Sequence, residues 1–409
     1  MSNGKRIAAV VLIIGFFVSV SVGLDWPQFR GPTRDGICKE TGLAKKWPEG
    51  GPKELWAYEE LGGGFSALSI VDGTIYTVGL VGTDGVLYAL DLNGKLKWKQ
   101  TYGREWTSKG QYPGTRTTPT IDGNRLYLMS GHGRIACYNA KTGERIWHKD
   151  TLEEFKGKNI EWGIAESVLI EGDMAICTPG GRDASVVALN KMNGQTIWTS
   201  KGLSEPSAYC SPMIVDCGPN RIILTLVQRS FVGIDARTGK VYWTHPHKVS
   251  YDINAVSPAY ADGMAYVTNG YRHGGHMYVL SADGTNSQRK WSGKNPDVHH
   301  GGVVLVDGCI HGAGTDQKWY CVELATGKVK FSERLVGKGS VIYADGMLYG
   351  YGERGEVGLI KINPGRYELV SSFKVTKGRD KHWAHPVISD GRLYIRHGNA
   401  LMCYDIKAR

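Results

Sequence analysis

The sequence is poor in proline and rich in glycine, with 15 prolines against 56 glycines in 409 residues. A glycine excess without proline-rich tracts excludes a collagen-like or linker chain and indicates many tight turns. Hydrophobic residues make up 41% and charged residues 22%, which is a globular balance and not a disordered one. The net charge is +10, but blocks of like charge and nucleic-acid motifs are absent. We therefore expect a basic surface, no nucleic-acid partner and a monomer.

The eight cysteines lack the spacings of the common cysteine motifs. The sequence contains no adjacent Cys–Cys pair, no C-x-x-C and no C-x-x-C-H, which excludes a c-type haem attachment site. Cys309 with Cys321, and Cys210 with Cys217, are nevertheless candidates for disulfide bonds. Cys137, Cys321 and Cys403 occupy one repeat position, described below, where a small core residue is expected.

Only one long apolar run is present, and it lies at the N-terminus. It covers the 16 residues from Ile7 to Val22, follows Lys5 and Arg6, and ends near Gly23. This pattern predicts a signal peptide over residues 1–23, and thus a periplasmic or secreted protein. An uncleaved membrane anchor is the alternative, but the run is shorter than the ~20 residues that a span requires.

The rest of the chain is a repeat. Each unit has an apolar run, an Asp-Gly turn, a second run with tyrosine, a third run ending in a small residue, an aliphatic residue and Asp or Asn, and then a glycine turn before Trp. Asp-Gly between apolar runs is a strong hairpin signal. The first turn recurs eight times, at Asp72, Asp122, Glu171, Asp216, Asp262, Asp307, Asp345 and Asp390. The closing aromatic residue recurs at Trp98, Trp147, Trp198, Trp243, Trp291, Phe331 and Phe373.

The eighth closing aromatic residue is missing because the chain ends at Arg409, after a third strand. Trp56 stands before the first complete unit and fits the vacancy. We therefore predict an all-β, eight-bladed quinoprotein-like β-propeller with four-stranded antiparallel blades, closed by the N-terminal segment. Residues 24–409 would form this single domain, with repeats near 67–98, 116–147, 165–198, 210–243, 255–291, 299–331, 338–373 and 383–409, the last completed by 52–60.

The repeats resemble the tryptophan-docking repeat of pyrroloquinoline-quinone (PQQ) propellers, as in YALDLNGKLKW, CYNAKTGERIW and GIDARTGKVYW. The opening DWPQFRGPTRDG is similar to the start of exported PQQ-like propeller proteins of planctomycete-type bacteria. EWGIAES, HHGGVVLVDG, GKGS and WAHPV resemble further strings of that group. The likeness covers the mature chain and implies the propeller fold. The resemblance is less specific for an activity than for the fold, because such repeats also build non-enzymatic scaffolds.

The crossings from one repeat to the next should lie at one mouth of the central channel. Polar and aromatic residues gather in these crossings, which is typical of a small-molecule site. The residues that we select are Arg116, Trp162, Glu166, Asn254, His299, His300, Lys338, Trp383 and His385.

Four histidines of two crossings make these segments candidates for chemistry. His299, His300 and His385, with Glu166, are our catalytic candidates, because histidine acts as a general base for an alcohol or as a metal ligand. No fixed-spacing metal motif is present, so histidines that only line a polar channel remain an alternative. His273 and His276, in a glycine-rich loop, are expected at the surface.

The remaining candidates suit a flat, anionic cofactor. Arg116 and Lys338 would pair with the carboxylates of a quinone, or else neutralise Glu161 or Glu166. Trp162 and Trp383 would stack on a cofactor or a sugar ring, or else pack in the core. The resemblance implies PQQ together with Ca²⁺ held by Glu, Asn and Asp, and Glu166 and Asn254 are the candidate calcium ligands. The adjacent cysteine pair of many alcohol-oxidising members is absent.

Three functions are compatible with these observations. The first is a PQQ-like propeller with a polar ligand site, acting as a dehydrogenase of alcohols, polyols or sugars if it is an enzyme. The second is a non-catalytic scaffold for envelope proteins, similar to the outer-membrane assembly propeller. A hydrolase or lyase without quinone is a third, for which the sequence offers no nucleophile motif.

Overall fold

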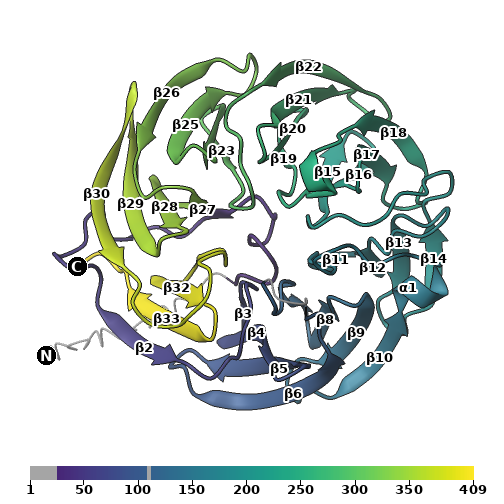
Figure 1. The fold of residues 1–409 in the computed structure, drawn as a ribbon, viewed down its shortest axis with the longest axis horizontal. Coiled ribbons are helices and arrows are strands. Elements are labelled where there is room, and N and C mark those ends of the chain that lie inside the picture. The colour runs from purple at the N-terminus through teal and green to yellow at the C-terminus, as the bar shows by residue number, and fades with distance from the viewer. Residues whose placement is uncertain (1–24, 108–111) are drawn as a thin grey trace, which may run out of the picture.

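The computed structural model describes residues 25–107 and 112–409, so the predicted signal peptide lies outside the described residues. Eight sheets stand around one axis and form a closed ring (Figure 1). The predicted eight-bladed propeller is therefore confirmed. Within the described ranges, no helix has the length and apolar character needed to cross a membrane.

We number the blades 1 to 8 by their innermost strands. Blades 1 to 4 contain β3 (Ser69–Val71), β4 (Thr74–Val81), β5 (Asp84–Asp91), β6 (Leu96–Arg104); β7 (Thr120–Asp122), β8 (Arg125–Met129), β9 (Arg134–Asn139), β10 (Arg145–Asp150); β11 (Leu169–Glu171), β12 (Met174–Cys177), β13 (Val187–Asn190), β14 (Thr196–Thr199); and β15 (Met213–Cys217), β16 (Asn220–Leu226), β17 (Ser230–Asp235), β18 (Val241–Pro246).

Blades 5 to 8 contain β19 (Ala259–Ala261), β20 (Met264–Asn269), β21 (Gly274–Leu280), β22 (Ser287–Gly293); β23 (Val304–Val306), β24 (Cys309–Ala313), β25 (Lys318–Glu323), β26 (Val329–Arg334); β27 (Gly339–Ala344), β28 (Met347–Gly352), β29 (Glu356–Asn363), β30 (Arg366–Lys374); and β31 (Val387–Ser389), β32 (Arg392–His397), β33 (Ala400–Asp405). The described helices are α1 (Thr151–Glu154) and the 3₁₀ turn η1 (Ser250–Asp252).

The closing tryptophans join each blade to the next. In blade 2, the Trp147 Nε1–H donates to Lys191 O of blade 3 at 3.0 Å. The indole covers Gly194 in the third-to-fourth-strand turn, where an added Cβ would lie 2.8 Å from the ring. Glycine is required there both for this close approach and for a φ of +75°. Phenylalanine replaces tryptophan in blades 6 and 7, and these blades lack the corresponding N–H donor.

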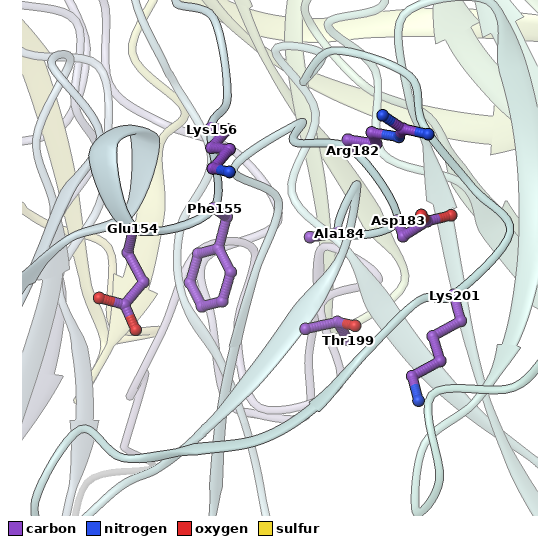
Figure 2. Close-up of a pocket in the computed structure, with 8 residues that line it drawn as sticks. All are labelled: Glu154, Phe155, Lys156, Arg182, Asp183, Ala184, Thr199 and Lys201. Carbon is purple, nitrogen blue, oxygen red and sulfur yellow. The ribbon is translucent and has the colours of Figure 1, made fainter.

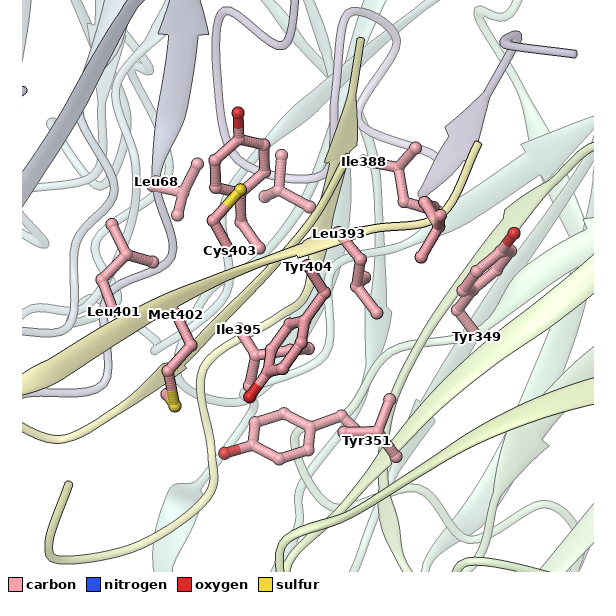
Figure 3. Packing of buried hydrophobic residues seen from close by; sticks show 14 of the residues in the cluster. Leu68, Tyr349, Tyr351, Ile388, Leu393, Ile395, Leu401, Met402, Cys403 and Tyr404 are labelled. Atoms are coloured by element: carbon pink, nitrogen blue, oxygen red, sulfur yellow. The ribbon is translucent and has the colours of Figure 1, made fainter. Parts of the chain in front are cut away.

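The N-terminal strand β2 (Glu54–Tyr58) closes the ring. It pairs antiparallel with β33, with Trp56 opposite Cys403, and Trp56 Nε1 donates to Leu92 O of blade 1 at 2.8 Å. In Figure 1 the purple β2 lies beside the yellow β33. The predicted closure is therefore confirmed. Buried aliphatic and tyrosine side chains pack around this junction (Figure 3).

The segment before β2 occupies the centre of the ring, which the sequence did not predict. We call residues 25–38 the channel segment. Trp26 N and O exchange hydrogen bonds with Ile70 O and N in blade 1. Its last part, β1 (Ile37–Cys38), pairs parallel with β27 and adds a fifth strand to blade 7. Figure 1 shows this purple segment crossing the middle of the propeller.

Two buried arginines anchor the channel segment to the blades. Arg34 Nη1 donates to Ser167 O at 3.0 Å and to Pro212 O at 2.8 Å, and Nη2 donates to Val168 O. Arg30 Nη2 donates to Val303 O on the other side of the channel. Burial lowers the pKa of Arg30 to about 10 and that of Arg34 to about 9, so both guanidinium groups stay charged at neutral pH.

All eight cysteines lie in the described ranges, and all are buried free thiols. Neither candidate disulfide is formed. In the ladder between β24 and β25, Cys321 faces His311, and its thiol lies in contact with that of Cys309 without a bond between them. Cys210 Sγ instead contacts Leu226 O, and Cys217 Sγ contacts the Tyr260 hydroxyl.

Candidate functional site

The crossings meet around a cavity of about 280 Å³ at one mouth of the channel. We call it the mouth pocket. Phe29 of the channel segment contributes to its lining. Polar groups and seven aromatic side chains line it, among them Phe29, Phe65, Tyr112, Arg116, Trp162, Tyr209, Tyr271, His299, His300, Trp383 and His385.

A hydrogen-bonded chain of charged and neutral groups forms one wall. His300 Nε2 lies 2.6 Å from Glu353 Oε1, and Lys338 Nζ lies 3.0 Å from Glu353 Oε2. Lys338 Nζ also donates to His299 Nδ1 at 3.2 Å, and His299 Nε2 lies 2.8 Å from the Tyr271 hydroxyl. Because the ammonium group can only donate, His299 accepts at Nδ1 and its Nε2–H donates to Tyr271.

The charge states along this wall follow from burial and from the neighbouring groups. Burial opposes ionisation of Glu353, but the His300 hydrogen bond and the Lys338 charge outweigh it and lower the pKa of Glu353 to about 2. Burial, with the charges of His300 and Lys338, lowers the pKa of His299 to about 3. At neutral pH the wall thus presents a carboxylate and a neutral imidazole.

Trp383 connects this wall to the aromatic part of the pocket. Its Nε1–H donates to Glu353 Oε1 at 2.9 Å. Its ring lies 5.0 Å from that of Phe65, 4.9 Å from that of Tyr112 and 5.2 Å from that of His300, between centroids. Three tilted rings therefore hold the indole in one orientation, and it lines the cavity as a preformed apolar surface.

Arg116 and Trp162 stand elsewhere on the pocket lining. The Arg116 guanidinium lies 4.9 Å above the Trp106 ring and donates to Gly114 O and Tyr112 O. It does not pair with Glu161 or Glu166, the partners considered from the sequence. Trp162 packs against Tyr209, with 6.2 Å between the ring centroids.

His385 links the pocket to the channel segment. It is 8% exposed, its Nε2 lies 3.1 Å from His300 O, and its Nδ1 lies 3.4 Å from Arg30 Nη1. Because the guanidinium donates to Nδ1, Nε2 carries the proton. Burial and the Arg30 charge hold the pKa of His385 well below its usual value. Both ring nitrogens are occupied by these contacts, which suits a positioning role.

Glu166 and Asn254 lie outside the mouth pocket. Glu166 is fully buried and accepts from Thr178 N and Oγ1, both at 2.6 Å. Asn254 donates to Val227 O at 3.1 Å and to Gln228 O at 3.0 Å. Six of the other candidates line the pocket, and Lys338 joins it through its hydrogen bond to His299.

This separation bears on the expected calcium and quinone. Calcium takes six to eight oxygen ligands, usually with several carboxylates. Glu353 is already bound by His300, Lys338 and Trp383, and burial raises the pKa of Glu166 to about 7. The residues present do not fit a Ca²⁺ site here. The aromatic side chains of the lining suit a flat ring, whether that ring belongs to a quinone or to another ligand.

The sequence reasoning did not select Glu353, Tyr271 or Phe29. Glu353 and Tyr271 lie in second-to-third-strand loops, which share the face of the crossings. The string GERGE around Glu353 was a usable signal, because such a loop had to end at the same mouth. Phe29 carried no signal, since its position depends on the channel segment.

A second hollow of about 550 Å³ lies beside α1 (Figure 2) and shares no lining residue with the mouth pocket. Its lining is mainly charged and polar, with Glu154, Lys156, Arg182, Asp183 and Lys201 around Phe155. It lacks the convergent aromatic rings of the mouth pocket. We therefore treat it as a surface groove.

The comparisons with known proteins agree with the fold. The model of a family described as outer membrane protein assembly factor BamB matches residues 83–333, well over half of the chain. This chain belongs to that family. The family match and the structural neighbours are PQQ-like propellers, as the repeats indicated.

Relatives of this PQQ-like propeller include two kinds of protein. The chain is 25% identical over 187 residues to the quinoprotein alcohol dehydrogenase PedH of Pseudomonas putida, covering 43% of this chain and 29% of that protein. It is 23% identical over 248 residues to the outer membrane protein assembly factor BamB of Shewanella oneidensis, covering 56% of each. The chain thus matches less than two thirds of the length of either relative.

Solved structures show the same division. BamB from Moraxella catarrhalis superposes with a TM-score of 0.61 at 14% identity, covering 87% of this chain and 98% of that one. Quinohemoprotein alcohol dehydrogenase from Comamonas testosteroni superposes with a TM-score of 0.66 at 12% identity, covering 94% and 81%. At these identities the likeness concerns the fold alone.

Proposed function

We propose that this protein is an exported PQQ-like propeller that binds a small carbohydrate or polyol in the mouth pocket. The observation that carries the proposal is the arrangement of Trp383 against the chain His299–Lys338–Glu353–His300. An aromatic ring offers a face for the C–H surface of a sugar, and the neighbouring groups offer hydrogen-bond donors and acceptors for its hydroxyls.

The size of the pocket favours a small ligand. Its 280 Å³ is close to the lower end of the range for small-molecule pockets, about 300–1,000 Å³. The lining is also largely preformed, because ring contacts and hydrogen bonds hold Trp383, His299 and Tyr271 in the absence of ligand. A monosaccharide or a short polyol suits this volume better than an oligosaccharide.

The same wall supports a proton-transfer role. Glu353 holds His300 through Nε2, and His300 Nδ1 has no hydrogen-bond partner among the described residues. A carboxylate that orients an imidazole is the usual arrangement of a general base. If the protein is an enzyme, we propose His300 as the general base; its Nδ1 is buried, so a ligand hydroxyl reaches it only after a shift of the lining. PQQ, as a dehydrogenase cofactor, would accept the hydride in such a reaction, but the residues do not provide its calcium ligands.

Binding is tested by titrating a panel of monosaccharides, disaccharides and polyols while following tryptophan fluorescence and heat. We expect at least one monosaccharide or polyol to bind, and Trp383→Ala to weaken it about tenfold, equivalent to about 1.4 kcal/mol. Phe155→Ala, in the groove beside α1, is the matched control and should bind like the wild type. Absence of binding across the panel, or equal binding by Trp383→Ala, would refute the proposal.

The dehydrogenase is a separate arm of the same experiment. Protein incubated with PQQ and Ca²⁺ is assayed for dye reduction with the ligands that bind. We expect no calcium-dependent reduction, because the buried Glu166 carboxyl group already accepts two hydrogen bonds from Thr178. Calcium-dependent reduction abolished by Glu166→Gln would instead establish the quinone-dependent enzyme.

The family description favours a second candidate, a scaffold for envelope proteins. Several curated relatives are BamB proteins. A pull-down from envelope extract, with wild type and with His299→Ala and His385→Ala variants, tests it. Specific partners that bind all three proteins equally would support the scaffold, whereas no specific partner would count against it.

A further inference from the structure

Three histidines gather on the pocket face at the junction of blades 4 and 5, outside the mouth pocket. His247 follows β18, His273 lies in the turn between β20 and β21, and His276 lies in β21. One ring nitrogen from each lies within 4.8 Å of the others. The ring centroids are 4.6 to 5.5 Å apart, and the rings are steeply inclined to one another, at 72° to 90°. His273 and His276 are half-buried, so the expectation of surface exposure does not describe them.

The hydrogen bonds of His247 identify which of its nitrogens is available. Asn269 Nδ2 donates to Ile253 O, so Asn269 Oδ1 is the acceptor for His247 Nε2, 3.2 Å away. His247 therefore carries its proton on Nε2 and a lone pair on Nδ1. His247 is 1% exposed, and its Nδ1 is buried without a partner among the described residues. A buried lone pair without a donor is costly unless another group binds it.

The other two rings already face each other through their ring nitrogens. His276 Nε2 and His273 Nε2 are 3.1 Å apart, and His276 Nδ1 lies 2.8 Å from Ser292 Oγ. Two histidine ligands of one tetrahedral Zn²⁺, at ~2.0–2.1 Å from the ion, are ~3.3–3.4 Å apart. The observed separation is close to this value. His276 would keep its proton on Nδ1 and donate it to Ser292 when Nε2 binds a metal.

The surroundings keep these imidazoles neutral. Burial, with the neighbouring His273 charge, lowers the pKa of His247 to about 3 and that of His276 to about 4. Burial also lowers the pKa of His273, against the opposing Asp297 charge. Arg289 also faces His276 and disfavours its charged form. Neutral imidazole is the form that binds transition metals, so no proton has to be expelled at pH 7.

We propose that His247, His273 and His276 form a binding site for a borderline transition-metal ion, Zn²⁺ in the first place. Nδ1 of His247 and Nε2 of His273 and His276 supply three ligands, and water occupies the fourth position. Asn269 and Ser292 orient two of the rings. His273 belongs to the turn between β20 and β21, which also carries Tyr271 of the mouth pocket.

The turn itself is built to hold this arrangement. Tyr271 and Arg272 both have positive φ, of 63° and 65°, a strained conformation for residues other than glycine. Asp297 compensates by accepting from Arg272 N and Gly274 N, both at 3.0 Å. The histidines are thus presented by a turn that is fixed independently of any metal.

The test is equilibrium dialysis of the chelator-treated full chain against Zn²⁺, with metal analysis and, in parallel, Co²⁺ absorption. We expect one tight Zn²⁺ per chain and a Co²⁺ spectrum of tetrahedral type. His273→Ala and His276→Ala should abolish both. Asn269→Ala should weaken Zn²⁺ binding ~10–100-fold.

Two further variants make the result decisive. A second group of potential metal ligands consists of His299, His300 and Glu353. Glu353→Gln alters this group and should leave the Zn²⁺ stoichiometry unchanged. His273→Gln preserves side-chain bulk and should lose Zn²⁺ while retaining the wild-type melting temperature of the chelated protein, which guards against misfolding. No Zn²⁺ binding by the wild type, or loss of binding in Glu353→Gln but not in His273→Gln, would overturn the assignment.

Discussion

Arg34→Ala is the substitution that tests the plugged channel most directly. The Arg34 side chain donates to three backbone carbonyls of blades 3 and 4, and its Nε donates to Gln28 Oε1 at 2.8 Å. An unsatisfied buried carbonyl costs ~1–3 kcal/mol, and water entering the space recovers part of it. We therefore expect a loss of about 3–5 kcal/mol.

The corresponding melting shift can be worked out from chain length. At ~2.1 cal/mol/K per residue, the roughly 380 described residues give an unfolding entropy of ~0.8 kcal/mol/K, so the expected fall in Tm is about 4–6 °C. Calorimetry measures it. Arg34→Lys keeps the positive charge but loses the branched guanidinium group, so its Tm should lie between those of the wild type and Arg34→Ala. The control, exposed Arg182→Ala, should change Tm by less than about 1 °C. A similarly small change for Arg34→Ala would refute the anchoring role of the channel segment.

Three further predictions concern ring closure, the docking turns and the pocket wall. Trp56→Ala should lower the free energy of unfolding by about 3 kcal/mol in denaturant titrations, since it removes the link from blade 8 to blade 1; an unchanged midpoint would contradict this. Gly194→Ala should destabilise more than Gly365→Ala, because both have positive φ but only the first Cβ meets a tryptophan; equal losses would argue against docking. Glu353 ionises below its ordinary pKa of 4.5 in the folded state, so its stabilisation is present above about pH 4.5 and is lost as the pH falls towards 2. Its side chain is 24% exposed, and with screening we expect about 1–2 kcal/mol. Glu353→Gln should therefore be less stable than the wild type at pH 7 and equal to it near pH 2, as measured by melting across pH.

The blades were predictable because local signals repeat. Asp-Gly turns such as that at Asp72 require positive φ, and the structure has φ of 48° there and 66° at Gly73. Trp56 predicted that the N-terminal strand closes the ring, because a repeat that lacks its last strand needs a strand from another part of the chain. The turns and the ring closure were both inferred from the spacing of residues within a repeat, which can be counted in the sequence.

The centre of the molecule was not predictable in the same way. Residues 25–38 have no periodicity, and their bonds are to carbonyls in blades that lie far away in the chain. Arg30 and Arg34 therefore read as ordinary surface cations, although both are buried. The sequence contains no local feature that distinguishes an arginine facing water from one that donates to a ring of main-chain oxygens.

The sequence predicted where the mouth pocket lies but not how all of its side chains are oriented. His299, His300, Lys338, Trp383, Arg116 and Trp162 were selected because they lie in crossings, and the structure brings them together around one space. Glu166 belongs to the same crossing as Trp162, yet its side chain turns away from the cavity to Thr178. A difference of a few residues within an irregular loop reverses the direction of a side chain, and no periodicity fixes it.

Ring closure by β2 has a consequence for how the protein is made. The strand that completes blade 8 leaves the ribosome early, but its partner β33 is among the last residues to emerge. Seven sheets can form in sequence, while blade 8 and its junction with blade 1 wait for a contact that spans almost the entire polypeptide. Such a contact is slow to form. Until synthesis finishes, β2 therefore lacks its partner strand.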